Sequence, residues 1–242
     1  MRLNAAKPVG LFLTGDISSG FLLESDLNFL ARSFDGPIYF VLGNHDYHKR
    51  HIESVHADVR RLCNEHANLH WMTDEGVISL DEDVALIGTE GWYDARLGDP
   101  RLLKFTFDWF LTMNFLQLEN MDERIRTWQT MAQSSASLIE ERLLKALDDH
   151  KTVYVLTHFP PWKEACRSYG TFMEKLWLPY NTNQILGETI EKIMANHKKK
   201  RVVVLAGHTH EACHIRVRSN IECIVARASY WGRVKPEKIV MI

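Results

Sequence analysis

The chain lacks several features that mark specialised classes of protein. Its 242 residues contain four cysteines, at positions 63, 166, 213 and 223, and no two of them have C-x-x-C spacing. This pattern excludes a zinc module built on cysteine pairs and is not that of a secreted disulfide framework, so we expect a cytoplasmic location. No apolar run approaches the ~20 residues of a membrane span, and the first residues hold no apolar signal segment.

An excess of charge of one sign is also missing. Lysine and arginine total 29 against 31 acidic residues, which gives a formal net charge of -2. Nucleic-acid binders usually carry a basic field, so we expect neither a nucleic-acid partner nor a membrane partner. The one basic run, residues 198–201, follows an amphipathic segment, and we assign it to the C-terminus of a helix, where the dipole favours cations.

The remaining composition is that of a globular protein, with 45% hydrophobic and 25% charged residues. No linker or repeat divides the chain, so we predict a single domain over residues 1–242. Short apolar runs alternate with longer segments of helical period, which predicts an α/β fold. Predicted strands cover residues 9–14, 37–42, 69–72, 77–80, 84–88, 152–157, 202–206, 214–217, 221–225 and 238–241. Predicted helices cover residues 25–34, 48–66, 102–120, 122–150 and 183–197.

Side chains of metal-ligand type follow four of the predicted strands. Parallel strands end at the same edge of a sheet, so we expect these residues to meet there despite their distance in sequence. We expect the glycines before Asp16, Asn44 and His208 to allow close backbone approach to an ion. An extended segment from His208 to His210 would place both imidazoles on one face.

The predicted ligands combine carboxylate, amide and imidazole groups. This set suits divalent Mn, Fe, Zn, Co or Ni better than a metal that prefers thiolates. A carboxylate can bridge two ions through its two oxygens, and such ion pairs serve displacement at phosphorus. Asp16 is the candidate bridging residue.

These motifs resemble the calcineurin-like metallophosphoesterase family. The matching blocks, in order along the chain, are Gly15-Asp16, Gly43-Asn44-His45-Asp46, His158 and Gly207-His208-Thr209-His210. Each block alone is a weak signal, whereas their combination is specific.

The resemblance implies a two-sheet α/β/β/α sandwich and a metal-binding hydrolase with a dinuclear site. Its substrate would be a phosphomonoester or phosphodiester, attacked in line by a metal-bound hydroxide. Asp16 would bridge the two ions. The first ion would also be bound by Asn44, His158 and His208, and the second by His210. His45 would bind the substrate phosphate and assist the leaving group, and Asp46 would fix the tautomer of His45.

The family's first block, Asp-x-His, is missing ahead of Gly15. The first strand and most of the first helix, which accompany this block in the family, would then be missing too. We assign residues 1–7 to the last turn of that helix. The second ion then keeps only Asp16 and His210, and we expect that site to be incomplete. We expect Met1 to lie inside a longer reading frame. The alternative function is a catalytically impaired phosphoesterase-like scaffold or binding protein; a nuclease is a third, which the near-neutral charge disfavours.

Other residues have simpler interpretations. We interpret the remaining histidines as surface or core residues: His48, His51, His56, His66, His70, His150, His197 and His214. The aromatic segment near residues 92–121 fits a packed helix face, with a cap that shapes the substrate pocket as the alternative. Trp162 lines either that pocket or the core.

Overall fold

The computed structural model describes residues 8–102, 106–166 and 170–228. Its strands are β1 (Leu11–Thr14), β2 (Ile38–Val41), β3 (Leu69–Trp71), β4 (Ile78–Ser79), β5 (Val84–Gly88), β6 (Thr152–Leu156), β7 (Arg201–Ala206), β8 (Cys213–Arg218) and β9 (Ile221–Val225). Its α-helices are α2 (Leu23–Ser33), α3 (Ile52–Glu65), α4 (Phe107–Leu111), α5 (Met113–Leu116), α6 (Met121–Asp149), α7 (Gly170–Asn181) and α8 (Gln184–Met194). The strand expected at 238–241 and the helical turn expected at 1–7 lie outside the described residues.

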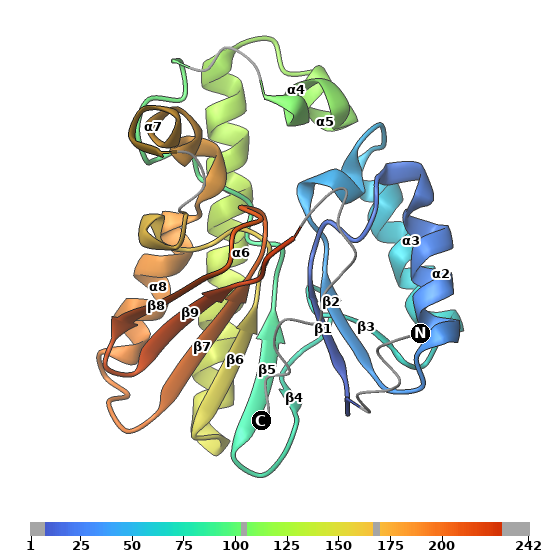
Figure 1. Cartoon of the computed structure of the whole chain (residues 1–242), viewed down its shortest axis with the longest axis vertical. Helices are drawn as coiled ribbons and strands as arrows, with labels where there is room; N and C mark the ends of the chain where they lie inside the picture. The colour runs from blue at the N-terminus through green and yellow to red at the C-terminus, as the bar shows by residue number, and fades with distance from the viewer. Residues whose placement is uncertain (1–7, 103–105, 167–169, 229–242) are drawn as a thin grey trace.

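The strands form two sheets. The smaller sheet has the order β1-β2-β3 and is parallel, and the larger has the order β4-β5-β6-β7-β9-β8. In the larger sheet β5, β6, β7 and β9 are parallel, whereas β4 and β8 pair antiparallel with their neighbours. Figure 1 shows α2 and α3 outside the smaller sheet and α6 and α8 outside the larger one. The expected α/β/β/α sandwich is therefore confirmed.

Apolar side chains fill each space between these layers. Val41, Met72 and Leu205 belong to the cluster between the two sheets, and Ile139 and Ile190 to the cluster between the larger sheet and its helices. The parallel strands β5, β6 and β7 are buried on both faces along most of their length, which explains why they read as continuous apolar runs rather than as alternating ones.

Helix α6 illustrates how the sequence specifies an element. Its N-cap Asn120 accepts a hydrogen bond from the backbone of Glu123, whose carboxylate accepts one from the backbone N–H of Glu119 in return. Buried residues then recur at three-to-four spacing along one face, including Ile139 and Leu143. The predicted helix rests on the helical period alone, and α6 begins and ends one residue before the predicted boundaries of 122 and 150.

The region between β5 and α6 differs from the prediction. One helix over 102–120 is wrong: α4 and α5 are separate, and Thr112 between them has an extended backbone with φ -93° and ψ 117°. The backbone N–H of Lys49 donates to the carbonyl of Leu111, and that of Met113 to the carbonyl of Arg50 at 3.1 Å. Tertiary contacts on both sides of the break thus override the helical period. Helix α7 was not predicted, and it contains Pro179.

The aromatic residues beside this region mostly belong to the core. Trp92, Tyr93, Trp109 and Phe115 are buried, as expected for a packed face, whereas Phe110 is exposed. Trp162 is buried as well, and its indole N–H donates to Glu191 at 2.9 Å, so it lies in the core. No disulfide is present among the described residues. No helix among the described residues is long and apolar enough to span a membrane.

Two adjacent leucines on α6 test this packing. Leu143 is fully buried, whereas Leu144 is 44% exposed. We expect Leu143→Ala to lower the free energy of unfolding by about 2–5 kcal/mol because it leaves a cavity against the larger sheet. Leu144→Ala is the matched control and should change it by less than about 0.5 kcal/mol. Chemical denaturation measures both, and equal losses would contradict the described packing.

Candidate metal centre

The predicted ligands all follow strands that end at one rim of the sandwich. Asp16 comes two residues after β1, Asn44 three residues after β2, and His158 two residues after β6. His208 and His210 follow β7. The strands belong to two different sheets, which differs from the single sheet edge that we expected, but their carboxyl ends meet at the seam between the sheets.

Glycines let these strand ends approach one another. A β-carbon on Gly15 would lie 2.6 Å from the backbone nitrogen of Gly43, and one on Gly43 would lie 2.6 Å from the ring of His158. A β-carbon on Gly207 would lie 2.8 Å from the carbonyl oxygen of Thr14. The described contacts of these glycines are therefore with neighbouring strand ends, whereas we expected them to make room for an ion.

Several predicted ligands have unusual backbone conformations. Asp16, His208 and His210 have φ values of 51°, 65° and 61°, in the left-handed region that non-glycine residues rarely adopt. The expected extended segment from His208 to His210 is therefore wrong, and the chain turns there. Such strain persists where the surrounding structure imposes it, and it is concentrated at functional sites.

Four potential donor atoms converge at the seam. Asn44 Oδ1 lies 3.0 Å from His158 Nε2 and 3.2 Å from His208 Nδ1. The two imidazole nitrogens are 3.3 Å apart, and Asp16 Oδ1 lies 3.5 Å from His158 Nε2. The atoms of Asp16, His158 and His208 all lie within 4.8 Å of one another.

The outer contacts of these side chains direct lone pairs inward. His158 Nδ1 donates to the carbonyl oxygen of Thr14 at 2.7 Å, which selects the tautomer whose lone pair is on Nε2. His208 Nε2 lies 3.0 Å from Asn181 Oδ1, an acceptor, which leaves the lone pair on Nδ1. Asn44 Nδ2 donates to Asp108 at 2.9 Å, so the amide oxygen faces the seam.

Neighbouring charge and burial have opposing effects on the pKa of Asp16. Burial alone would raise the pKa of its carboxyl, but the neighbouring imidazoles, His158 foremost, hold that pKa well below its ordinary value. Burial, and secondly His158, lower the pKa of His208 far below its usual range, which keeps the ring neutral and able to coordinate. The centre thus combines the ionised carboxylate of Asp16 with the neutral imidazole of His208 and the amide oxygen of Asn44.

This arrangement fits a bound divalent cation. Acceptors that face acceptors repel one another unless a cation lies between them, and the mixed donor set suits borderline divalent metals. Asp16 Oδ2 is also buried and has no hydrogen-bond partner within the part of the chain that the structure describes, although it lies 4.0 Å from His210 Nε2. Asp16 therefore has one oxygen toward the cluster and a second near His210, as a bridging role requires.

His45 and Asp46 differ in their surroundings. The backbone N–H of His45 donates to Asp16 Oδ1 at 3.0 Å, and its half-buried ring has a pKa lowered by burial, which the charge of Asp16 opposes. Asp46 is fully buried and accepts backbone hydrogen bonds from Gly43 at 2.8 Å, Ser18 at 2.8 Å and Ile17 at 3.3 Å. Burial, and then the charge of Asp16, raise the pKa of Asp46, which the three N–H groups oppose. These contacts tie the loop after β1 to the loop after β2.

Sequence reasoning missed the outer partners. Asp108 and Asn181 neither follow a strand nor belong to a recognised motif, so nothing in the sequence marks them. His48, interpreted as a core or surface residue, is buried and lies 3.0 Å from Asp108. Its ring centroid is 4.6 Å from that of His45.

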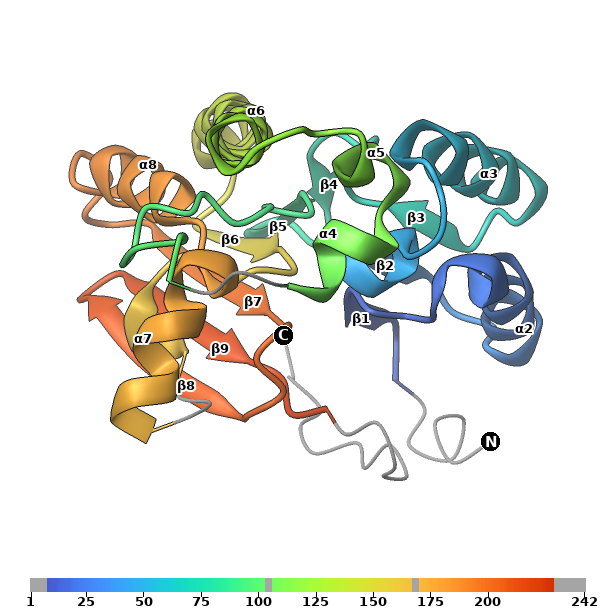
Figure 2. The same cartoon turned by 90° about the horizontal axis from the view of Figure 1, so that it is seen from above.

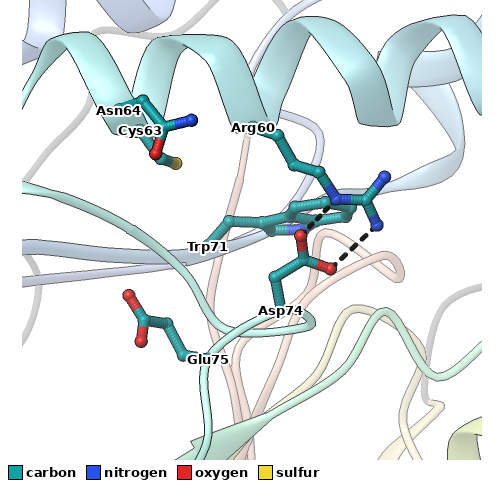
Figure 3. A pocket seen from close by; sticks show the side chains of 6 residues that line it. All are labelled: Arg60, Cys63, Asn64, Trp71, Asp74 and Glu75. Carbon is teal, nitrogen blue, oxygen red and sulfur yellow. Dashed lines mark hydrogen bonds and ion pairs between the residues drawn. The ribbon is translucent and has the colours of Figure 1, made fainter.

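A shallow hollow elsewhere on the surface has no part in this centre. It lies between α3 and the loop after β3, with Arg60 paired to Asp74 and placed over the Trp71 ring at 5.3 Å (Figure 3). None of the predicted site residues lines it.

Comparisons with known proteins agree with the motif analysis. A family model described as calcineurin-like phosphoesterase matches residues 2–212. No curated protein sequence matches the chain. A solved structure of a dimetal phosphatase from Danio rerio is similar, with 13% identity, a TM-score of 0.44 and coverage of 90% of this chain and 87% of that one. Another is GAP50, the anchor in the inner membrane complex of Plasmodium, with 12% identity, a TM-score of 0.49 and coverage of 93% and 63%.

Metal addition after chelation tests the centre. We expect Mn²⁺ at 100 times its dissociation constant to stabilise the protein by about 2.7 kcal/mol, because only the folded state assembles the donors. Thermal unfolding with and without the ion measures this. His158→Ala should abolish the shift, and the exposed His51→Ala should keep it. A full shift in His158→Ala would contradict the assigned donor set.

Proposed function

The chain belongs to the calcineurin-like phosphoesterase family, and we propose that it hydrolyses a phosphomonoester or phosphodiester with divalent metal. The proposed ligands of one ion are Asp16, Asn44, His158 and His208, with Asp16 shared by a second ion next to His210. Mn, Fe, Zn, Co and Ni all suit these donors.

One observation supports this proposal above all others. Hydrogen bonds outside the cluster hold His158, His208 and Asn44 so that their lone pairs point at one another and at Asp16 Oδ1. A purely structural cluster would turn one of these groups to donate a hydrogen bond, because buried acceptors without donors are costly. The unpartnered Asp16 Oδ2 adds a further acceptor on the side of His210.

Different residues would then have different roles in the hydrolysis. Bound ions would neutralise charge on the phosphate and lower the pKa of a water molecule, so that hydroxide would be available to attack phosphorus. The side chains of Asp16 and Asn44 would fix the position of the phosphate relative to that water. His45 would donate a hydrogen bond to a phosphate oxygen and a proton to the departing group.

The predicted role of Asp46, fixing the tautomer of His45, stays a prediction. Its three backbone donors favour a different task, which is to hold the loop that carries Asn44 and His45 against the loop that carries Asp16. We assign it to positioning rather than to proton transfer.

A catalytically impaired scaffold is the alternative. It is favoured by the second set of donors, which among the described residues consists only of Asp16 Oδ2 and His210 Nε2, 4.0 Å apart. A cytoplasmic location is part of the main proposal and is supported by the cysteine spacing, which is not that of a secreted disulfide framework.

A substrate panel separates these functions. The chelated protein, reloaded with Mn²⁺, Zn²⁺, Co²⁺ or Ni²⁺, is assayed on phosphomonoesters and phosphodiesters. We expect turnover with at least one ion and its loss in Asp16→Ala and His208→Ala, with unchanged circular dichroism. Metal binding without turnover in the wild-type protein would favour the scaffold, and no metal binding would reject both.

His45→Ala tests the proton donor. We expect unchanged metal content and a rate for alkyl phosphates lowered by roughly 10²–10⁴-fold, since an alkoxide departs poorly without a proton. The rate for p-nitrophenyl phosphate should fall much less, because its leaving group is stable as an anion. Equal losses for both substrates, or none, would refute this role.

A further inference from the structure

Asp108 is a buried carboxylate with no assigned role. It lies on α4, which in Figures 1 and 2 occupies the same end of the molecule as the loops that follow β1 and β2. Its side chain is only 8% exposed, and its Oδ1 accepts a hydrogen bond from Asn44 Nδ2 at 2.9 Å. Asp108 thus contacts a proposed metal ligand on the side away from the cluster.

The contact decides which way the Asn44 amide faces. The oxygen and nitrogen of an amide have nearly the same shape, and only the oxygen can bind a cation. An ionised carboxylate accepts hydrogen bonds and donates none, so only Nδ2 of Asn44 can face Asp108. The amide oxygen is then directed at His158 Nε2 and His208 Nδ1, at 3.0 and 3.2 Å.

Without a bound ion, the opposite orientation of the Asn44 carboxamide would be favourable. A flipped Asn44 would point N–H groups at the two imidazole lone pairs and satisfy them. That arrangement would occupy the centre with donors and exclude a metal ion. Asp108 opposes it, since a flip would bring the amide oxygen against the carboxylate.

The position of Asp108 is itself well fixed. Trp109, the next residue, is buried, and its ring lies 6.2 Å from that of Trp128. The side chain of Asn114 accepts a hydrogen bond from the backbone of Ile52 at 2.8 Å. His48 Nε2 also lies 3.0 Å from Asp108 Oδ1. The helical segment is therefore held against the loop after β2.

We propose that Asp108 is a positioning residue that holds the Asn44 carboxamide with its oxygen toward the metal ion. This inference rests on the proposed function, because it requires an ion at the seam. It assigns to the α4–α5 segment a task beyond the packed face or cap that the sequence suggested: the segment presets the geometry of a ligand on another element.

The test measures Mn²⁺ affinity of the full chain by titration calorimetry after chelation. Asp108→Leu keeps the size of the side chain and removes its acceptor. We expect its dissociation constant to rise by ~10–100-fold, the usual cost of losing an outer partner of a metal ligand. Asp94→Leu is the matched control, because it removes a buried carboxylate that accepts from the backbone of Arg96 and Ile185 and contacts no proposed ligand, and it should bind Mn²⁺ like the wild type.

The same substitution made in an Asn44→Asp variant separates control of the amide orientation from a merely structural role of Asp108. The two oxygens of a carboxylate are equivalent, so in Asn44→Asp there is no orientation to control. In that background Asp108→Leu should cause no further loss of affinity, and relief of the repulsion between the two carboxylates should favour binding. A loss as large as in the wild-type background would overturn the proposal.

The remaining outcomes are equally decisive. Wild-type affinity in Asp108→Leu, or an equal loss in Asp94→Leu, overturns the inference and leaves the proposed function standing. Failure of the wild-type protein to bind Mn²⁺, Zn²⁺, Co²⁺ or Ni²⁺ rejects the proposed function instead. If Asp108→Leu does not fold, Asp108→Ala takes its place, since it removes the same acceptor; weaker binding supports the proposal and wild-type affinity overturns it.

Discussion

The centre of this molecule depends on the mutual repulsion of buried acceptors. Asn44 Oδ1, His158 Nε2, His208 Nδ1 and Asp16 Oδ1 come together at the seam between two sheets, with their donor groups engaged elsewhere. Among the described residues, no strand pairing joins one sheet to the other. A cation at the seam would therefore satisfy the acceptors and also connect the two halves of the sandwich.

Several costly local features make sense in view of this constraint. Three of the predicted ligands have positive φ values, and glycines allow strand ends to lie closer than β-carbons permit. Buried polar contacts outside the cluster, from Thr14, Asn181 and Asp108, set the direction of each donor. The geometry of the proposed ligands is therefore set by residues that do not themselves face the cluster.

Much of the fold was predictable because its signals are local. The apolar strands and the capped, periodic α6 can be read from short windows of sequence, and the family motifs gave the order of the layers. The break between α4 and α5 could not be read in this way, since it depends on backbone contacts with residues 49 and 50. The turn from His208 to His210 was likewise missed, because histidine adopts positive φ more often than most residues but only in a small minority of cases, so its presence does not specify a turn. Asp108 and Asn181 were missed for a related reason: an outer partner needs only to be an acceptor at the right place, and many positions supply one.

The central claim concerns where a metal ion lies, and anomalous scattering from crystals soaked in Mn²⁺ tests it most directly. The account predicts an anomalous peak at the seam, about 2.0–2.3 Å from Asp16, Asn44, His158 and His208, with the oxygen of the Asn44 amide toward the ion. A well-diffracting crystal with no peak there, or with the ion bound elsewhere on the protein, would contradict it.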